Sequence, residues 1–194
     1  MSRILLAGLL VLSATPALAQ QAAPAVPVPA VGKPLGGPQI PGVCLLSQAA
    51  VFTNAKVGVA ASARLKALSE QAQAEVTADR APIEADAKQV DALPAGADKT
   101  ARTQALSVRL QALQTKANLL NREIDATRIK ALDRIAVQEQ TVISQVYTAH
   151  KCGLLFDRNS VFGGNMGGDL TADVVKGLDA LMSTITFDRE VLAK

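Results

Sequence analysis

Aromatic residues are scarce in this chain of 194 residues: they make up 3% of it, and tryptophan is absent. Apolar residues nevertheless reach 49%, and most of them are alanine, valine and leucine. Without large rings a core stays thin, whereas alanine and leucine are among the best helix formers. The length predicts one domain, and the composition favours long, slender helices within it.

Residues suited to catalysis or metal binding are also few. The one histidine, His150, stands at the expected end of a long helix, where a cation is favourable. Its neighbours Lys151 and Cys152 do not complete a metal set. No glycine-rich loop carries a phosphate-binding lysine, and no serine lies in a nucleophile elbow. The sequence therefore argues against an enzyme and indicates no cofactor and no metal. Its net charge of only +3 is too small to indicate a nucleic-acid partner.

Long apolar runs are missing as well, apart from a short one at the start. Arg3 precedes the apolar residues 4–12, and Ala17-Leu18-Ala19 offers a small-x-small cleavage site. The run is shorter than the roughly 20 residues of a transmembrane helix. Residues 1–19 are therefore predicted to be a secretory signal peptide cleaved near Ala19, and the mature protein is expected to be exported.

Proline is concentrated in residues 20–41, which hold six of the nine prolines of the chain. Such a composition favours extended, polyproline-like backbone and has no periodic apolar face. We expect a disordered leader here, with a recognition segment as the alternative.

Helical patterns dominate residues 54–150. The first segment runs from Asn54 to about Ala92 and contains Pro82, which predicts a kink or break near residues 80–82. Residues 93–97 form a turn with its tip at 94–96, and Asp98 is the expected N-cap of the second segment. That segment extends to His150 without proline or glycine, a length of about 80 Å.

An apolar seam follows the second segment in the steps of four and three residues that are typical of a coiled coil. A one-residue phase shift divides its members into two groups: Leu106, Leu110, Leu113, Ala117, Leu120 and Ile124, then Leu132, Ile135, Val142 and Val146. Residues 54–150 are therefore predicted to fold at 94–96 into an antiparallel helical hairpin.

The two arms of this hairpin carry opposite charge. Seven acids lie between residues 67 and 98: Glu70, Glu75, Asp79, Glu84, Asp86, Asp91 and Asp98. Five bases and no acid lie between residues 99 and 122: Lys99, Arg102, Arg109, Lys116 and Arg122. The pairs expected to lie level are Glu75 with Lys116, Glu70 with Arg122, and Asp125 with Lys66. Exposed pairs contribute only about 0–1 kcal/mol each, so they would select register; the alternative is two solvated faces of unrelated charge.

A small body is expected to close the hairpin. The apolar residues 42–47 and 153–157 predict two short strands, and residues 163–168 a flexible loop. Thr171 is the expected N-cap of a short amphipathic helix that reaches about residue 182. The predicted fold class is α+β, mostly α, with a body of residues 42–53 and 151–183, arms of residues 54–150, and a C-terminal tail of residues 184–194.

The two cysteines, Cys44 and Cys152, flank the hairpin at its base. Export to an oxidising compartment favours a disulfide between them. Antiparallel neighbouring strands, however, would place Cys152 nearer Gln48 than Cys44 and leave the sulfurs too far apart. An intrachain disulfide, two buried thiols and a bridge between subunits all remain open.

Two segments of the body carry a family likeness. Residues 154–161 (LLFDRNSV) and 169–175 (DLTADVV) closely resemble the C-terminal signature of the Skp/OmpH family, and residues 43–46 with 51–52 resemble its first strand and the lead into its first helix. The resemblance covers residues 42 to about 182. It implies a homotrimeric, non-enzymatic, periplasmic holdase chaperone. In it, a β-stranded trimerisation body carries three hairpins around a cavity that holds unfolded outer-membrane β-barrel proteins without ATP.

The five bases of the second arm are candidates for contact with clients or with anionic lipid. Family members are often more basic, whereas the charges here nearly balance, so only a weak contact with anionic lipid or lipopolysaccharide is expected. The alternative function is a structural coiled-coil adaptor of the cell envelope, which would link other proteins through its hairpin.

Overall fold

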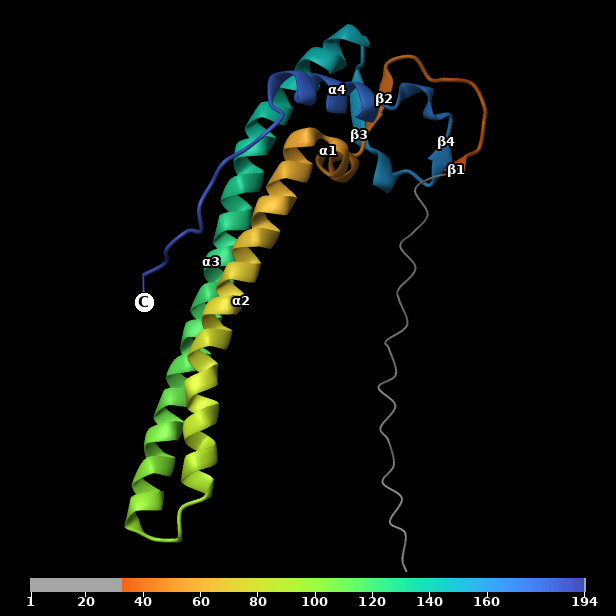
Figure 1. Cartoon of the computed structure of the whole chain (residues 1–194). Coiled ribbons are helices and arrows are strands. Elements are labelled where there is room, and N and C mark those ends of the chain that lie inside the picture. The colour runs from red at the N-terminus through yellow and green to blue at the C-terminus, as the bar shows by residue number, and fades with distance from the viewer. Residues whose placement is uncertain (1–32, 194) are drawn as a thin grey trace, which may run out of the picture. The chain divides into compact units, whose positions relative to one another are not determined.

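The computed structural model describes residues 33–193, so the predicted signal peptide and most of the predicted leader lie outside the described residues. The elements, in chain order, are β1 (Lys33–Pro34), β2 (Val43–Leu46), α1 (Gln48–Asn54), α2 (Lys56–Asp91), α3 (Ala97–Ala149), β3 (Leu154–Asp157), β4 (Gly163–Gly164) and α4 (Thr171–Leu181). Two short 3-10 helices span Arg158–Ser160 and Met166–Gly168. Figure 1 shows α2 and α3 side by side as a hairpin, with the strands and α4 gathered at one end. The predicted fold class, mostly helical with a small strand region, is confirmed.

The first arm begins two residues later than predicted. Ala55 has extended backbone (ψ 141°) and separates the short helix α1 from α2, which starts at Lys56. Gly58 lets the two helices approach closely, because a Cβ at this position would meet the Phe52 carbonyl. The chain therefore turns sharply into the arm after a short helix, α1, that was not predicted, because the helical pattern was expected to begin only at Asn54.

Helix α2 does not break at Pro82. It continues to Asp91 with this proline inside it, so the prediction of a break is wrong. A proline removes one internal hydrogen bond, but Ile83 next to it is buried against the second arm in a cluster with Leu113. Packing along the hairpin thus holds the helix together across the proline.

The seam between the arms follows the prediction in part. Leu113, Leu120 and Ile124 are buried as expected, but Leu110 is more than half exposed and Leu132 is also exposed. Between the buried residues Ile124 and Ile135, the seam passes through Thr127 and Ala131, which are both 2% exposed. These residues are small or polar, so a search for large apolar residues skips them and places the seam at the wrong phase.

The arms pair in a register one helical turn away from the predicted one. Lys116 Nζ lies 2.6 Å from Asp79 Oδ2, not beside Glu75, and Arg109 pairs with Asp86. Glu70 lies 3.7 Å from Lys66 on its own helix. Seam packing decides this register, because exposed ion pairs contribute too little to impose another one.

The strands of the body are parallel, and so they are not the antiparallel neighbours that would keep the two cysteines apart. β2 pairs with β3 from Val43 opposite Leu154 to Leu46 opposite Asp157, and β1 pairs with β4. Helix α3 passes the start of α2 and reaches the level of Gly42, whose carbonyl accepts the Gly153 and Leu154 N–H groups at 2.6 and 2.9 Å. The chain therefore enters β3 beside the start of β2. The predicted flexible loop 163–168 instead contains β4 and a 3-10 helix.

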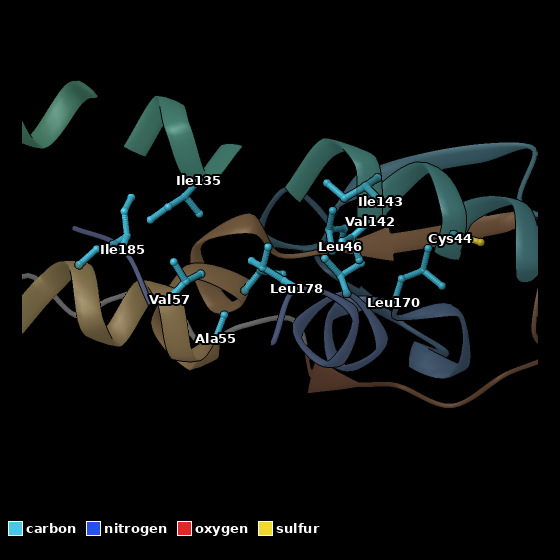
Figure 2. Packing of buried hydrophobic residues seen from close by; sticks show 13 residues of the cluster. Cys44, Leu46, Ala55, Val57, Ile135, Val142, Ile143, Leu170, Leu178 and Ile185 are labelled. Carbon is cyan, nitrogen blue, oxygen red and sulfur yellow. The ribbon is translucent and has the colours of Figure 1, made fainter. Parts of the chain in front are cut away.

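The main core lies where the body meets the base of the hairpin. Figure 2 shows side chains from β2, α2, α3 and α4 converging there, among them Leu46, Val57, Ile135 and Leu178. Helix α4 starts at Thr171, which is the first helical residue and not the N-cap that was predicted. Likewise α3 starts at Ala97, and Asp98 lies in its first turn. None of the helices among residues 33–193 has the length and apolarity needed to span a bilayer.

Candidate functional site

The five basic candidates of the second arm lie along α3 from the tip towards the base, and most already have partners within the hairpin. Lys99 Nζ donates to the carbonyls of Asp91 and Leu93 at 3.0 and 3.1 Å and so closes the tip turn. Arg102 Nε lies 3.3 Å from Asp98. Each of these bases serves the hairpin's own structure.

Two more bases, Arg109 and Lys116, join the arms through Asp86 and Asp79. Arg122 is exposed and has no ion-pair partner among residues 33–193. The five bases thus do not form one free cationic surface, because acids of the first arm neutralise the middle of the row.

The signature residues of the body meet at the end of β2. The backbone N–H of the buried Ser47 donates to Thr171 Oγ1 at 3.0 Å, and the Ser47 hydroxyl accepts from Asn159 Nδ2 at 3.4 Å. Asp169 Oδ1 accepts from the Thr171 N–H at 2.9 Å, while Asp169 Oδ2 lies 2.7 Å from Arg158 Nη1. The conspicuous polar residues of the signature therefore bind one another and hold β2, β3 and α4 together.

The carboxyl of Asp169 is the charged centre of this network. Burial acts to raise its pKa, but hydrogen bonds from the Thr171 hydroxyl and N–H, together with the Arg158 guanidinium, outweigh that and hold the pKa below its usual value. Asp169 is therefore a structural anion in the body.

The two cysteines lie at the base of the hairpin and are joined by a disulfide. Cys44 in β2 and Cys152 after α3 have Cα atoms 5.8 Å apart. The parallel strands bring them together, since α3 ends at the level where β2 begins. The bond closes a loop that contains both arms.

Residues 183–193, here called the C-terminal segment, lie along the hairpin and have no regular secondary structure. Figure 1 shows this segment leaving α4 and running beside the long helices. Ile185 is buried in the main core, and Phe187 packs against both the main core and the seam cluster further along the arms. From the sequence, residues 184–194 were predicted only as a C-terminal tail.

Both arms bind the backbone of the C-terminal segment. Arg134 Nη1 donates to the Thr186 carbonyl at 3.0 Å, and Arg64 Nε donates to the Phe187 carbonyl at 2.9 Å. Further along, the Glu190 N–H donates to Thr127 Oγ1 at 2.9 Å. The hydrogen bonds end at Leu192, whose N–H donates to Glu123 Oε1 at 3.3 Å.

Charged side chains add to these contacts. Arg189 lies between the arms, with Nη1 2.8 Å from Glu75 of α2 and Nε 3.3 Å from Glu123 of α3. Glu123 is buried, so Arg189 neutralises a carboxylate that water reaches poorly. We call this face of the hairpin the tail groove; it is formed by Arg64, Glu75, Glu123, Thr127, Lys130 and Arg134.

A second groove lies on the other side of the seam and has no occupant from residues 33–193. Phe52, Leu65, Ile124 and Leu132 supply its apolar lining, and Arg128 stands at its edge. Its residues on α3 are spaced four positions apart (i, i+4). They are offset by one position from residues of α3 that contact the C-terminal segment, such as Glu123 and Thr127. They therefore lie on a neighbouring face of the helix. We call it the open groove.

Large apolar side chains are also exposed singly along the arms. Those more than half exposed are Val59, Val108, Leu110, Ile129 and Val137. Isolated exposed residues of this kind are common on soluble proteins. Here four of the five lie on α3 and one on α2, so the arms offer several small apolar contacts that are separate from one another.

Chemistry-bearing groups in the described residues are dispersed. No group of three or more metal-ligating side chains occurs within residues 33–193. His150 Nε2 lies 2.9 Å from Asp173 Oδ2, which links the end of α3 to α4. Buried Glu139 has one oxygen, Oε1, without a hydrogen-bond partner in this part of the chain, and burial raises the pKa of its carboxyl.

Comparison with known proteins gives a consistent result. The matching family model is described as outer membrane protein (OmpH-like) and covers residues 42–178. A crystal structure of a candidate outer membrane chaperone (OmpH-like) from Caulobacter crescentus CB15 is 40% identical to this chain, with a TM-score of 0.74. It covers 80% of this chain and 94% of its own. No curated protein matches the chain. The match over most of the described residues shows that the chain belongs to the OmpH-like family of outer membrane proteins.

Proposed function

We propose that this protein is an ATP-independent holdase chaperone that binds unfolded outer-membrane β-barrel proteins in the periplasm and prevents their aggregation. The family supports a chaperone role, because the similar Caulobacter protein is described as a candidate outer membrane chaperone. The observation that carries the proposal is the distribution of separate exposed apolar side chains along the arms, mostly on α3, together with the open groove.

An unfolded client chain requires a binding surface that accepts many different sequences. An unfolded β-barrel chain presents many short apolar stretches of varied sequence, so one fitted pocket would bind few of them. Separate apolar contacts, such as Val108, Ile129 and the open groove, can each bind weakly and jointly hold a long chain. Release then needs no nucleotide, because each contact is weak and exchanges independently.

We further propose that the protein acts as a homotrimer joined through its body. Both sheets among residues 33–193 are two-stranded, and such sheets are marginal alone because their edges lack partners. Phe156 of β3 and Phe162 beside β4 are exposed large rings on this body. Strands from other subunits would pair with these edges and cover the rings. Light scattering at micromolar concentration should give a trimer mass, and a monomer mass would refute this part of the proposal.

The test of the holdase function uses a urea-denatured outer-membrane β-barrel protein diluted into buffer without ATP. With the purified mature protein present in slight molar excess of trimer, turbidity from aggregation should stay near baseline. Serum albumin at equal mass is the control for nonspecific protein. Aggregation at the rate seen with albumin would overturn the proposal.

A further inference from the structure

We propose that the tail groove is a binding site for extended polypeptide, that the C-terminal segment is its resident occupant, and that an extended client segment displaces it. This inference rests on the proposed function, since it names one of the surfaces that would bind the client. The site lies on the base half of the hairpin, between α2 and α3.

The tail groove binds the backbone of its occupant. Arg134 and Arg64 donate to consecutive carbonyls, those of Thr186 and Phe187. Thr127 and Glu123 accept from the backbone N–H groups of residues 190 and 192. The Thr127 hydroxyl is itself oriented by donating to the Glu123 carbonyl at 2.6 Å, which leaves its oxygen available to accept. Groups that every residue possesses thus make four of the contacts, so the groove can accept chains of different sequence.

The backbone bound in the tail groove is extended. The hydrogen bonds progress from Arg134 to Glu123 on α3, a rise of about 16 Å along the helix axis. An extended chain from Thr186 to Leu192 spans about 20 Å, whereas a helix of that length would span about 9 Å. Only an extended chain can therefore reach the contacts at both ends.

The side chains of the occupant alternate between more buried and exposed positions. Ile185 is buried and Phe187 and Arg189 are partly buried, while Thr184, Thr186 and Asp188 between them are exposed. This period of two is that of a β-strand with one apolar and one polar face. Strands of outer-membrane barrels alternate in the same way. The C-terminal segment thus presents to the arms what a strand of an unfolded client would present.

The charge of the groove adds a preference. Arg189 meets the carboxylates of Glu75 and the buried Glu123. A client segment that replaces the C-terminal segment should therefore carry a basic residue two positions after an apolar one. A segment with an acidic residue there would leave two carboxylates facing a third negative charge.

The occupant is held in a way that permits exchange. It has no regular secondary structure, Val191 near its end is 87% exposed, and the Asp188 carboxylate that pairs with Arg64 is 96% exposed. Its advantage is its attachment to α4, which gives it a local concentration on the order of millimolar. A client that already contacts the arms elsewhere has the same advantage and can compete.

The direct test uses a fluorescent synthetic peptide of residues 183–193 as the probe. In the full chain, the paired substitutions Ile185→Asp and Phe187→Asp should release the resident segment. Fluorescence anisotropy should then show the peptide binding at least tenfold more tightly to this released variant than to the parent protein. The same peptide with aspartate at both positions should bind neither protein.

A second pair of substitutions locates the site. Adding Thr127→Val and Arg134→Ala to the released variant removes two backbone contacts and keeps the buried volume at position 127, and it should weaken peptide binding at least fivefold. Gln104→Asp, an exposed change towards the tip, should leave binding unchanged. Equal binding by the parent and released proteins, or by the released and groove-substituted proteins, overturns the proposal.

Deuterium exchange on the unaltered protein decides the matter if the released variant does not fold. Addition of a urea-denatured β-barrel protein should increase deuterium uptake in residues 184–193 severalfold, because the N–H groups of residues 190 and 192 lose their acceptors. Unchanged uptake at client saturation refutes displacement.

If the parent suppresses aggregation while uptake is unchanged, the groove assignment fails and the holdase function stands. If the parent does not suppress aggregation but the released variant binds the peptide, the groove stands and the holdase function fails.

Discussion

The base half and the tip half of the hairpin are built from the same two helices, yet they are supported differently. At the base, α4 and the C-terminal segment pack against the arms, and Val57, Ala61, Ile135 and Val142 belong to a core shared with the body. Towards the tip the arms have only each other, through Ile83 and Leu113 and exposed ion pairs. Stability is therefore concentrated at the base, and the tip half is expected to open locally at lower free energy.

This difference suits the proposed function. A firm base fixes where the arms start, and the weakly supported tip half can adjust to clients of different size. The following changes test whether the two halves differ in this way, beginning with the largest expected effect on the free energy of unfolding.

Removing the disulfide should have the largest effect. Replacing Cys44 and Cys152 with serine reopens a loop of more than 100 residues, which the chain-entropy model values at about 4–5 kcal/mol. Urea unfolding should show this loss, and dithiothreitol should produce a similar loss in the parent protein but none in the variant. A loss below about 1 kcal/mol would mean that the base does not depend on this closure.

Truncating the core of the body should come next. Leu178 is fully buried, so Leu178→Ala should lower the free energy of unfolding by about 3 kcal/mol. The matched change Leu110→Ala in the tip half alters an exposed side chain and should cost less than about 0.5 kcal/mol. Equal losses of stability for Leu178→Ala and Leu110→Ala, measured by thermal or urea unfolding, would contradict the contrast between the two halves.

Glu139 should give the base a pH dependence. Burial raises the pKa of this carboxyl in the folded protein above the unfolded value near 4.5, so the folded state binds its proton more tightly. Stability from this group is then present at low pH and falls as pH rises from the unfolded pKa through the folded one. Glu139→Gln should therefore stabilise the protein more at pH 7 than at pH 4 in urea unfolding. An equal gain at both values would show that ionisation of Glu139 carries no penalty.

Loss of one arm-to-arm ion pair should have the smallest effect. Lys116→Gln removes the pair with Asp79, and because both side chains are about half exposed, the loss should stay below about 1 kcal/mol and shrink with added salt. Arg122→Gln is the matched control, since Arg122 has no ion-pair partner among the described residues. A loss above about 2 kcal/mol for Lys116→Gln alone would show that ion pairs hold the tip half together.

The sequence predicted those parts of the molecule whose signals are local. Proline and glycine at 94–96 indicated the tip, and the spacing of Leu113, Leu120 and Ile124 indicated the seam. The seam was misplaced at Leu110 and Leu132, because Thr127 and Ala131 give no strong hydrophobic signal although packing buries them. The charge difference between the arms correctly indicated pairing, but charge alone could not fix a register that the buried seam decides.

The parts that escaped prediction depend on long-range contacts. The direction of β3 follows from how far α3 extends beyond the start of α2, which no residue in the strand reveals. The C-terminal segment lacks a helical or long strand pattern, and its partners, such as Arg64 and Glu123, lie more than 60 residues away in the chain. A signal was nevertheless present in the alternation of Thr184, Ile185, Thr186 and Phe187, which indicates an extended segment with one buried face.

The central claim is that client holding requires the full length of the arms, while the body and the base are sufficient for folding and assembly. The direct test shortens both arms by two heptads, through deletion of residues 77–90 and 105–118. These segments are level in the observed register of Lys116 with Asp79, so the seam stays in phase and each arm shortens by about 21 Å. The tip turn, the disulfide, the tail groove and the open groove are all retained.

The deciding measurement is the turbidity of a urea-denatured β-barrel protein diluted with equal molar amounts of the parent or the shortened protein. The account predicts that the shortened protein keeps the oligomeric mass of the parent and a melting temperature within a few degrees, yet loses most of its suppression of aggregation. Full suppression by the shortened protein would contradict the claim and would place client holding in the body and the base of the hairpin.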